Sequence, residues 1–192
     1  DCFLLADSQA LAISSPATLE TLAIDLGDGT YAVRFKRSGV YQYVRVDGDF
    51  SAGQALPGTS GALWTVVLEK AYAFFRTGAN TYSSLNLGAT DTVFNDLGIA
   101  NTGIAVAFGT ASSLFSTIST ALAAGKAVAF MSNASIGGGI PIITNHCYSV
   151  YSIVWTGSSF NITLRNPWGT DGAGSDGDPA DALPLLPARV LR

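Results

Sequence analysis

The helix-forming segments of this chain come mostly before its strand-forming segments, and this order restricts the folds open to it. The predicted helices are 2–12, 63–75 and 112–124, and the predicted strands after them are 127–131, 148–155 and 160–165. One earlier pair of β-branched and aromatic runs, 30–35 and 41–46, is typical of a hairpin. The polar, Gly-containing stretch 77–103 is predicted to be a connection. Helices followed by strands indicate the α+β class.

The composition is that of a folded chain with few charges. Of its 192 residues, 48% are hydrophobic and 12% are charged, against a usual charged share of about 25%. The net charge of −4 argues against nucleic acid as a partner, because phosphate binding needs a positive surface. No apolar run approaches the roughly 20 residues of a membrane-spanning helix, and no signal peptide is visible. The first residue is Asp1 rather than Met, so we expect the chain to be part of a longer polypeptide.

His146 is the only histidine, so any imidazole base must be this residue. It stands at the start of the predicted strand 148–155, and Asn166 follows the next predicted strand, 160–165. A tight turn between the two strands would bring His146 and Asn166 side by side. An amide oxygen beside an imidazole N–H fixes the tautomer and the orientation of the ring. The two residues are therefore a candidate base and the group that orients it.

Cys2 is the candidate nucleophile. It begins the predicted helix 2–12, and a helix N-terminus lowers the pKa of a cysteine thiol through its aligned backbone dipoles. Cys147 is the competing candidate. The alternation of side chains along a strand predicts that Cys147 points away from the face of His146. We therefore expect Cys147 to be a small buried hydrophobic residue, and for the same reason we expect no disulfide with Cys2.

Four blocks of the sequence resemble the calpain family of cysteine proteases. The blocks are residues 1–6, 63–73 with 82–85, 146–150 and 164–169. The first is similar to the family's Gly-Asp-Cys-Trp-Leu-Leu-Ala, the third to its His-Ala-Tyr-Ser-Val, and the last contains its Asn-Pro-Trp-Gly. Each block alone is weak, but four in the family's order across nearly the whole chain make coincidence improbable.

The resemblance implies a papain-like fold of two lobes with the active-site cleft between them. A helical lobe with a β-hairpin would take residues 1–102, and a β-rich lobe would take residues 103–192. The implied function is that of a cysteine endopeptidase, a thiol protease that hydrolyses peptide bonds of protein or peptide substrates through a Cys2-His146-Asn166 triad. By the same resemblance, Trp168 shields the His–Asn pair and lines the substrate cleft.

Two positions depart from the family pattern. Asn145 stands where the family usually has Gly before the histidine, so its side chain is expected at the substrate cleft. The family's oxyanion hole also uses a Gln side chain upstream of the cysteine, and this sequence contains no residue there. That departure leaves an alternative open, a catalytically impaired calpain-like module for binding or scaffolding. Another papain-fold reaction, such as transglutaminase-like acyl transfer, is a third possibility that the four blocks disfavour.

No cofactor is required by the sequence, and calcium is the candidate to consider. Asp171, Asp176 and Asp178 offer oxygen ligands in a Gly-rich loop, which suits Ca²⁺, although a plain solvent-exposed acidic loop is the favoured explanation. By the family resemblance, Glu69 is at the position of a calcium ligand in the first lobe. A zinc site is not supported, because one histidine and two distant cysteines cannot supply its ligands.

Overall fold

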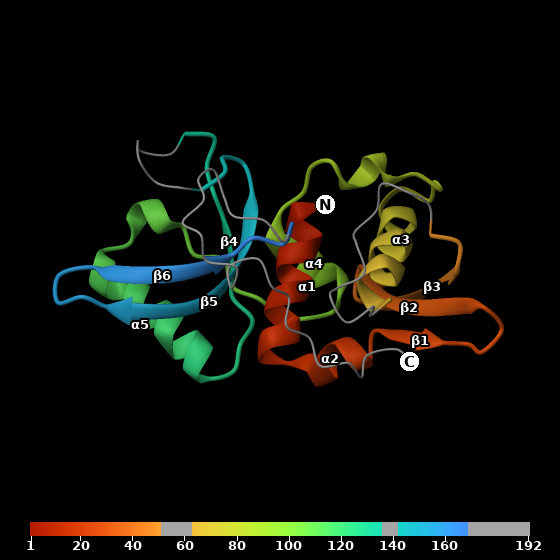
Figure 1. Cartoon of the computed structure of the whole chain (residues 1–192), viewed down its shortest axis with the longest axis horizontal. Helices are drawn as coiled ribbons and strands as arrows, with labels where there is room; N and C mark the ends of the chain where they lie inside the picture. The colour runs from red at the N-terminus through yellow and green to blue at the C-terminus, as the bar shows by residue number, and fades with distance from the viewer. Residues whose placement is uncertain (51–62, 136–141, 169–192) are drawn as a thin grey trace.

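Helix α1 (Cys2–Ser14) lies between two small antiparallel sheets (Figure 1). A computed structural model describes residues 1–50, 63–135 and 142–168 of the chain. Each sheet has three strands, in the order β1-β2-β3 and β4-β5-β6. The α+β class predicted from the sequence is therefore observed, although the first sheet places more strand in the first half of the chain than the sequence pattern suggested. Within the described ranges, no helix has the length and apolar character needed to span a membrane.

The first sheet is built around a tight hairpin. Strands β2 (Thr30–Arg37) and β3 (Val40–Asp47) pair antiparallel, with Arg37 opposite Val40. The predicted loop of five residues is thus a turn of two. Both Ser38 and Gly39 have positive φ, 51° and 82°, as a type I′ turn requires. The short strand β1 (Ala23–Asp25) follows helix α2 (Pro16–Glu20) and completes the sheet.

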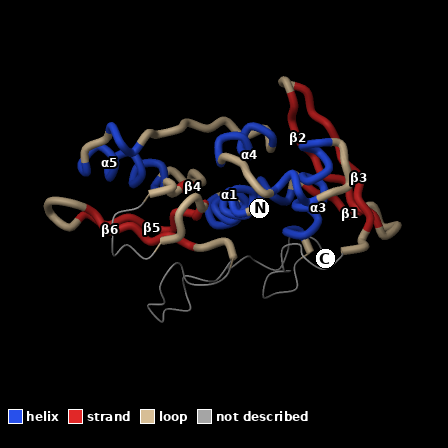
Figure 2. The backbone as a smooth tube through the Cα atoms, turned by 90° about the horizontal axis from the view of Figure 1, so that it is seen from above, coloured by secondary structure: helices blue, strands red, loops and turns tan. Residues whose placement is uncertain are grey.

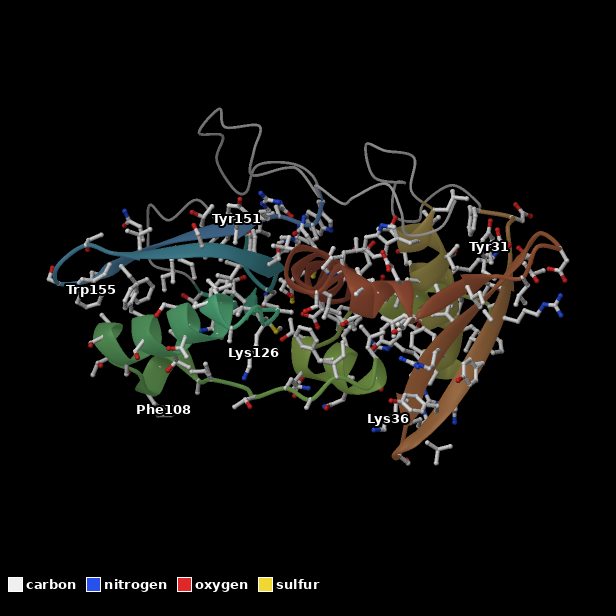
Figure 3. All side chains as sticks on the ribbon, turned by 90° about the horizontal axis from the view of Figure 1, so that it is seen from below. Tyr31, Lys36, Phe108, Lys126, Tyr151 and Trp155 are labelled. Atoms are coloured by element: carbon white, nitrogen blue, oxygen red, sulfur yellow. The ribbon has the colours of Figure 1, made fainter. Side chains whose placement is uncertain are left out.

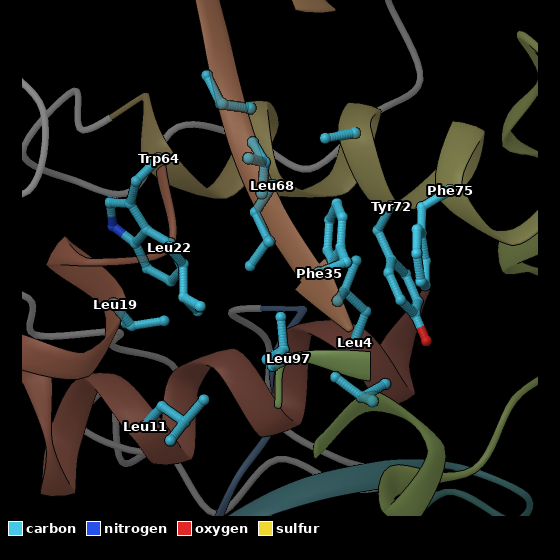
Figure 4. Packing of buried hydrophobic residues seen from close by; sticks show 14 of the residues in the cluster. Leu4, Leu11, Leu19, Leu22, Phe35, Trp64, Leu68, Tyr72, Phe75 and Leu97 are labelled. Atoms are coloured by element: carbon cyan, nitrogen blue, oxygen red, sulfur yellow. The ribbon is translucent and has the colours of Figure 1, made fainter. Parts of the chain in front are cut away.

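Helix α3 (Trp64–Thr77) closes the hydrophobic core against this sheet. It extends two residues beyond the predicted range 63–75 and is capped by Gly78, whose φ of 70° lies in the left-handed region that glycine adopts most easily. Tyr72 and Phe75 of α3 pack on Phe35 of β2, with the Phe35 and Phe75 ring centroids 4.6 Å apart (Figure 4). All three side chains are almost completely buried.

The segment predicted as a connection, 77–103, contains a short 3-10 helix, Tyr82–Leu85, and the helix α4 (Thr90–Asp96). The prediction was wrong here because α4 has seven residues and only two buried apolar side chains, Val93 and Phe94, which is too few for a clear helical period. The same segment makes a close backbone contact with α1: a Cβ atom at Gly88 would lie 2.4 Å from the Phe3 ring.

The second sheet carries β4 (Ala129–Met131), β5 (Cys147–Trp155) and β6 (Phe160–Arg165). The register between β5 and β6 shifts by one residue between Val150 and Ser152. Helix α5 (Ala111–Ala123) covers one face of this sheet (Figure 2). Trp155, at the far end of β5, packs over α5 with its ring centroid 5.3 Å from that of Phe115 (Figure 3). A short 3-10 helix, Val106–Phe108, precedes α5.

Candidate active site

The imidazole of His146 is hydrogen-bonded to the side chain of Asn166. The Nε2 atom of His146 lies 2.9 Å from Oδ1 of Asn166, and both side chains are buried. His146 directly precedes β5 and Asn166 directly follows β6, so the pairing of these two strands brings together residues that are far apart in the sequence. The juxtaposition expected from the strand pattern is therefore present.

The same amide oxygen also fixes the tautomer of the ring. Oδ1 of Asn166 accepts a hydrogen bond from the backbone N–H of Trp168 at 3.1 Å, so it faces the imidazole as an acceptor. Nε2 of His146 must then carry the hydrogen and donate it. Nδ1 is left as the ring nitrogen that can exchange a proton with another group.

Backbone contacts with Ser132, which follows β4, hold His146 in place. The backbone N–H of His146 donates to Oγ of Ser132 at 2.9 Å, and the backbone N–H of Ser132 donates to the carbonyl of His146 at 2.9 Å. The ring packs edge-on against Tyr148 at 4.8 Å between centroids and tilts against Trp168 at 4.1 Å. The imidazole therefore has little freedom to rotate.

Cys2 begins α1, and its thiol is poised as a thiolate. Its pKa is lowered from the ordinary value to about 4, chiefly because the Cys147 side chain hydrogen-bonds to the sulfur. Burial opposes this shift, while a hydrogen bond and the charge of His146 lower the pKa further. Since Nε2 of His146 is engaged by Asn166, Nδ1 is the ring nitrogen available to Cys2. The structure thus shows the hydrogen bond between His146 and Asn166, and His146 contributes to the lowered pKa of Cys2.

Cys147 is buried, as expected, but its side chain does not point away from the site. The alternation itself holds, since the His146 ring packs on Tyr148 two residues further along, but it does not predict where the opposite face of β5 packs. The face of β5 that carries Cys147 and Ser149 packs on α1, where the Ser149 hydroxyl donates to Oε1 of Gln9 at 2.5 Å. Cys147 therefore faces α1 and belongs to the hydrophobic cluster against which Cys2 packs.

Asn145 and Trp168 are the exposed neighbours of the buried pair. Asn145 has a φ of 51°, a conformation that favours glycine and that asparagine tolerates better than most residues. Asn145 therefore adopts a backbone conformation that the glycine usual in the family would also adopt easily. Trp168 is 52% exposed and lies over His146, and its indole N–H is 3.4 Å from Oδ1 of Asp1. The Asp1 carboxylate occupies the N-cap position of α1 but caps no backbone N–H of that helix.

Comparison with known families agrees with this geometry. The family model described as calpain family cysteine protease matches residues 1–181. The chain belongs to this family. A comparison with curated proteins finds none that matches. Membership of the calpain family suggests cysteine peptidase activity, and a protease domain implies protein substrates.

Only one of the predicted metal ligands of this calpain-family chain lies in the residues that the structure describes. Glu69 is buried on α3, and Asp171, Asp176 and Asp178 lie outside the described residues. Within residues 1–50, 63–135 and 142–168, no group of three or more His, Cys, Asp or Glu side chains could hold a metal ion. Calcium binding in the Gly/Asp loop stays a prediction.

Two contributors to the site were missed in the sequence of this calpain-family member. Ser132 accepts a hydrogen bond from the backbone N–H of His146. Strand β4 pairs with β5 so that Met131 lies opposite Cys147, and this register places Ser132 beside His146. Only knowledge of that register could have identified Ser132. Asp7 of α1 is also buried against the site, and burial followed by the charge of Asp91 raises its pKa to about 9. A charged residue type inside a helix gave no sign that it would be buried.

Proposed function

We propose that this chain is a cysteine endopeptidase in which Cys2 is the nucleophile, His146 the general base and acid, and Asn166 the residue that orients His146. The observation that carries the proposal is the buried hydrogen bond between Asn166 and His146, and the influence of His146 on the pKa of Cys2 supports it. The lowered pKa of Cys2 means that the thiolate, which is the reactive form, predominates at neutral pH. These are the parts of a nucleophile, a base and an orienting group in the order that covalent catalysis needs.

The reaction follows from this geometry as acyl transfer. The Cys2 thiolate attacks the carbonyl carbon of the scissile peptide bond, and a tetrahedral oxyanion forms. The imidazolium of His146 gives its Nδ1 proton to the leaving amine, the C–N bond breaks, and a thioester with Cys2 remains. Water then gives a proton back to His146 as it attacks the thioester, which releases the acid product and restores the thiolate.

The backbone N–H of Cys2 is our candidate for one oxyanion donor. It belongs to the first turn of α1, where N–H groups have no acceptor within the helix. The N-terminus of α1 also favours negative charge, both on the thiolate and on the developing oxyanion. A single donor of this kind typically contributes 10²–10³ in rate, on the order of 3–4 kcal/mol.

We further propose that the substrate lies in a cleft between two lobes, residues 1–102 and 103–192, in a papain-like arrangement. Two features support this. The sheets lie on opposite sides of α1. Among the described residues, the buried members of the main hydrophobic cluster come from residues 3–97, with Cys147 as the one later member. Trp168 and Asn145 are the exposed residues beside the His–Asn pair, so we place them along the cleft, where Trp168 would keep water from the buried hydrogen bond.

Alkylation at mildly acidic pH tests the assignment without requiring turnover. Iodoacetamide reacts with thiolates, so Cys2 is expected to be carboxymethylamidated at pH 6, where an ordinary thiol is almost fully protonated. Peptide mass mapping would locate the label. The Cys2→Ala variant should take no label, and His146→Ala should be labelled more slowly at pH 6, because it loses a group that stabilises the thiolate.

Cleavage of an unfolded protein such as reduced casein tests the reaction itself, with calcium and with a chelator in parallel. Wild type should produce fragments, and Cys2→Ala should not. Label on Cys147 in preference to Cys2 would contradict the nucleophile assignment. Labelling of Cys2 with no cleavage under either condition would instead support the catalytically impaired binding module.

A further inference from the structure

The molecule places its two cysteines next to each other at the centre of the site. Cys2 is the first residue of α1 and Cys147 the first residue of β5, and these two elements pack together. Both thiols are free. Cys2 packs against the hydrophobic cluster to which Cys147 belongs, and each cysteine shifts the pKa of the other. The family motif has Ala after the histidine, so this second thiol is a feature of this chain and not of the triad.

We propose that Cys2 and Cys147 are a redox pair, in which a peroxide oxidises Cys2 and Cys147 then closes onto it as a reversible disulfide. Cys2 is only partly buried, whereas Cys147 is 1% exposed. A small oxidant from solvent therefore meets Cys2 first. Cys147 lies behind it, in the position of a resolving thiol.

The two steps balance with hydrogen peroxide as the oxidant. The Cys2 thiolate attacks one peroxide oxygen, the O–O bond breaks, and the departing hydroxide takes up a proton as water. The sulfur becomes a sulfenic acid, oxidised by two electrons. The Cys147 sulfur then attacks the Cys2 sulfur, the S–S bond forms and the S–O bond breaks. The hydroxyl group leaves with the Cys147 proton as a second water.

The environment of Cys147 keeps it inactive until Cys2 has been oxidised. The pKa of Cys147 is raised far above its ordinary value, first by its hydrogen bond to Cys2, then by burial and by the charge of the Cys2 thiolate. Conversion of Cys2 to a neutral sulfenic acid removes two of those three causes. His146 is then no longer paired with a thiolate and can pass the Cys147 proton to the departing hydroxyl group. The raised pKa therefore keeps Cys147 a protonated, weak nucleophile while Cys2 is a thiolate.

Peroxide treatment followed by mass spectrometry tests the proposal independently of any peptidase activity. Wild type is expected to lose two hydrogens and both titratable thiols, to yield a cross-linked Cys2–Cys147 peptide, and to recover both thiols with dithiothreitol. The Cys147→Ala variant should instead gain two or three oxygens on Cys2, a change that dithiothreitol does not reverse. The Cys2→Ala variant should keep Cys147 unmodified over the same time.

A wild-type protein that gains oxygens on Cys2 as fast as Cys147→Ala does, with no cross-linked peptide, would overturn the proposal. If the Cys147→Ala variant does not fold, Cys147→Ser keeps the size and a weak donor while removing the resolving sulfur. The cross-linked peptide is measured on wild type in any case. Since none of these readouts depends on proteolysis, failure here leaves the triad assignment standing, and an inactive triad leaves this result interpretable.

Discussion

The contacts on the two sides of α1 differ in polarity. On the side of β1-β2-β3 and α3, the core is apolar and aromatic, with Phe35, Tyr72 and Phe75 stacked in its centre. On the side of β4-β5-β6, the contact with α1 is largely polar. Among the described residues, every buried polar or charged side chain except Glu69 lies on α1 or beside the second sheet; these are Asp7, Ser8, Gln9, Ser132, His146, Ser149, Arg165 and Asn166.

Because of this difference, the residues that stabilise the fold and the residues proposed for catalysis lie largely on different sides of α1. Burying an apolar side chain stabilises the fold by about 1.5–3 kcal/mol, whereas a buried polar group needs a partner merely to avoid a cost. We infer that the first side supplies most of the free energy of folding and that the second side uses part of it to hold reactive groups in a dry environment. Helix α1 belongs to both sides, so it transmits the rigidity of the apolar core to Cys2.

Truncation in the apolar core should have a large effect on stability. Phe35→Ala removes a ring that is completely buried between α3 and α1 and should lower the free energy of unfolding by about 3–5 kcal/mol. Leu114→Ala is the matched change on the other side, where Leu114 is the only buried residue of α5, and should cost about 2 kcal/mol. Chemical denaturation measures both. Equal losses of unfolding free energy in the two variants would contradict the inference that the first side supplies most of the stability.

Asp7 is expected to make stability depend on pH. Its carboxyl group is buried, neither of its oxygens has a hydrogen-bond partner in the described residues, and its pKa is raised to about 9 by burial and then by Asp91. Tyr72 and Cys147 also face it. The folded state keeps a proton that the unfolded state releases above about pH 4. The free energy of unfolding should therefore fall as pH rises from about 4 to about 9, by at most ~1.4 kcal/mol per pH unit.

Asp7→Asn, which has no proton to release, is the variant that isolates this dependence. Denaturation curves at pH 5 and pH 8 should differ by less in Asp7→Asn than in wild type. The comparison uses the change with pH and not the absolute stability, because the amide also lacks partners at every pH. Parallel pH profiles for the two proteins would show that Asp7 is ionised in the folded state.

The smallest expected effect concerns the orienting residue of the polar side. Asn166→Ala removes the acceptor that holds Nε2 of His146, while the apolar core is untouched. Proteolysis should fall by about 10–10³, less than in Cys2→Ala, because the orienting member of a triad typically contributes less than the nucleophile. The melting temperature should change little. Full activity at unchanged thermal stability would refute the role given to Asn166.

The sequence predicted the parts of this molecule that have strong local signals. The helix that ends at Gly78, the hairpin, and the strands that bring His146 to Asn166 all follow from periodicity and turn residues. The position of Cys147 did not follow, because it depends on which face of β5 packs on α1, and that choice is made by contacts between distant segments. Helix α4 was missed for a similar reason, since packing and not its own sequence stabilises it.

The close contact between Phe3 and Gly88 has a consequence for how such a chain can evolve. A single added methyl group at position 88 would overlap the Phe3 ring, and Phe3 is the residue next to Cys2. The two positions therefore cannot vary independently: a side chain at 88 requires a smaller ring at 3, and an indole at 3 requires a different course of the backbone near 88. Homologous chains should show correlated replacement at these positions, and a library that randomises both together should recover functional pairs that single substitutions never reach.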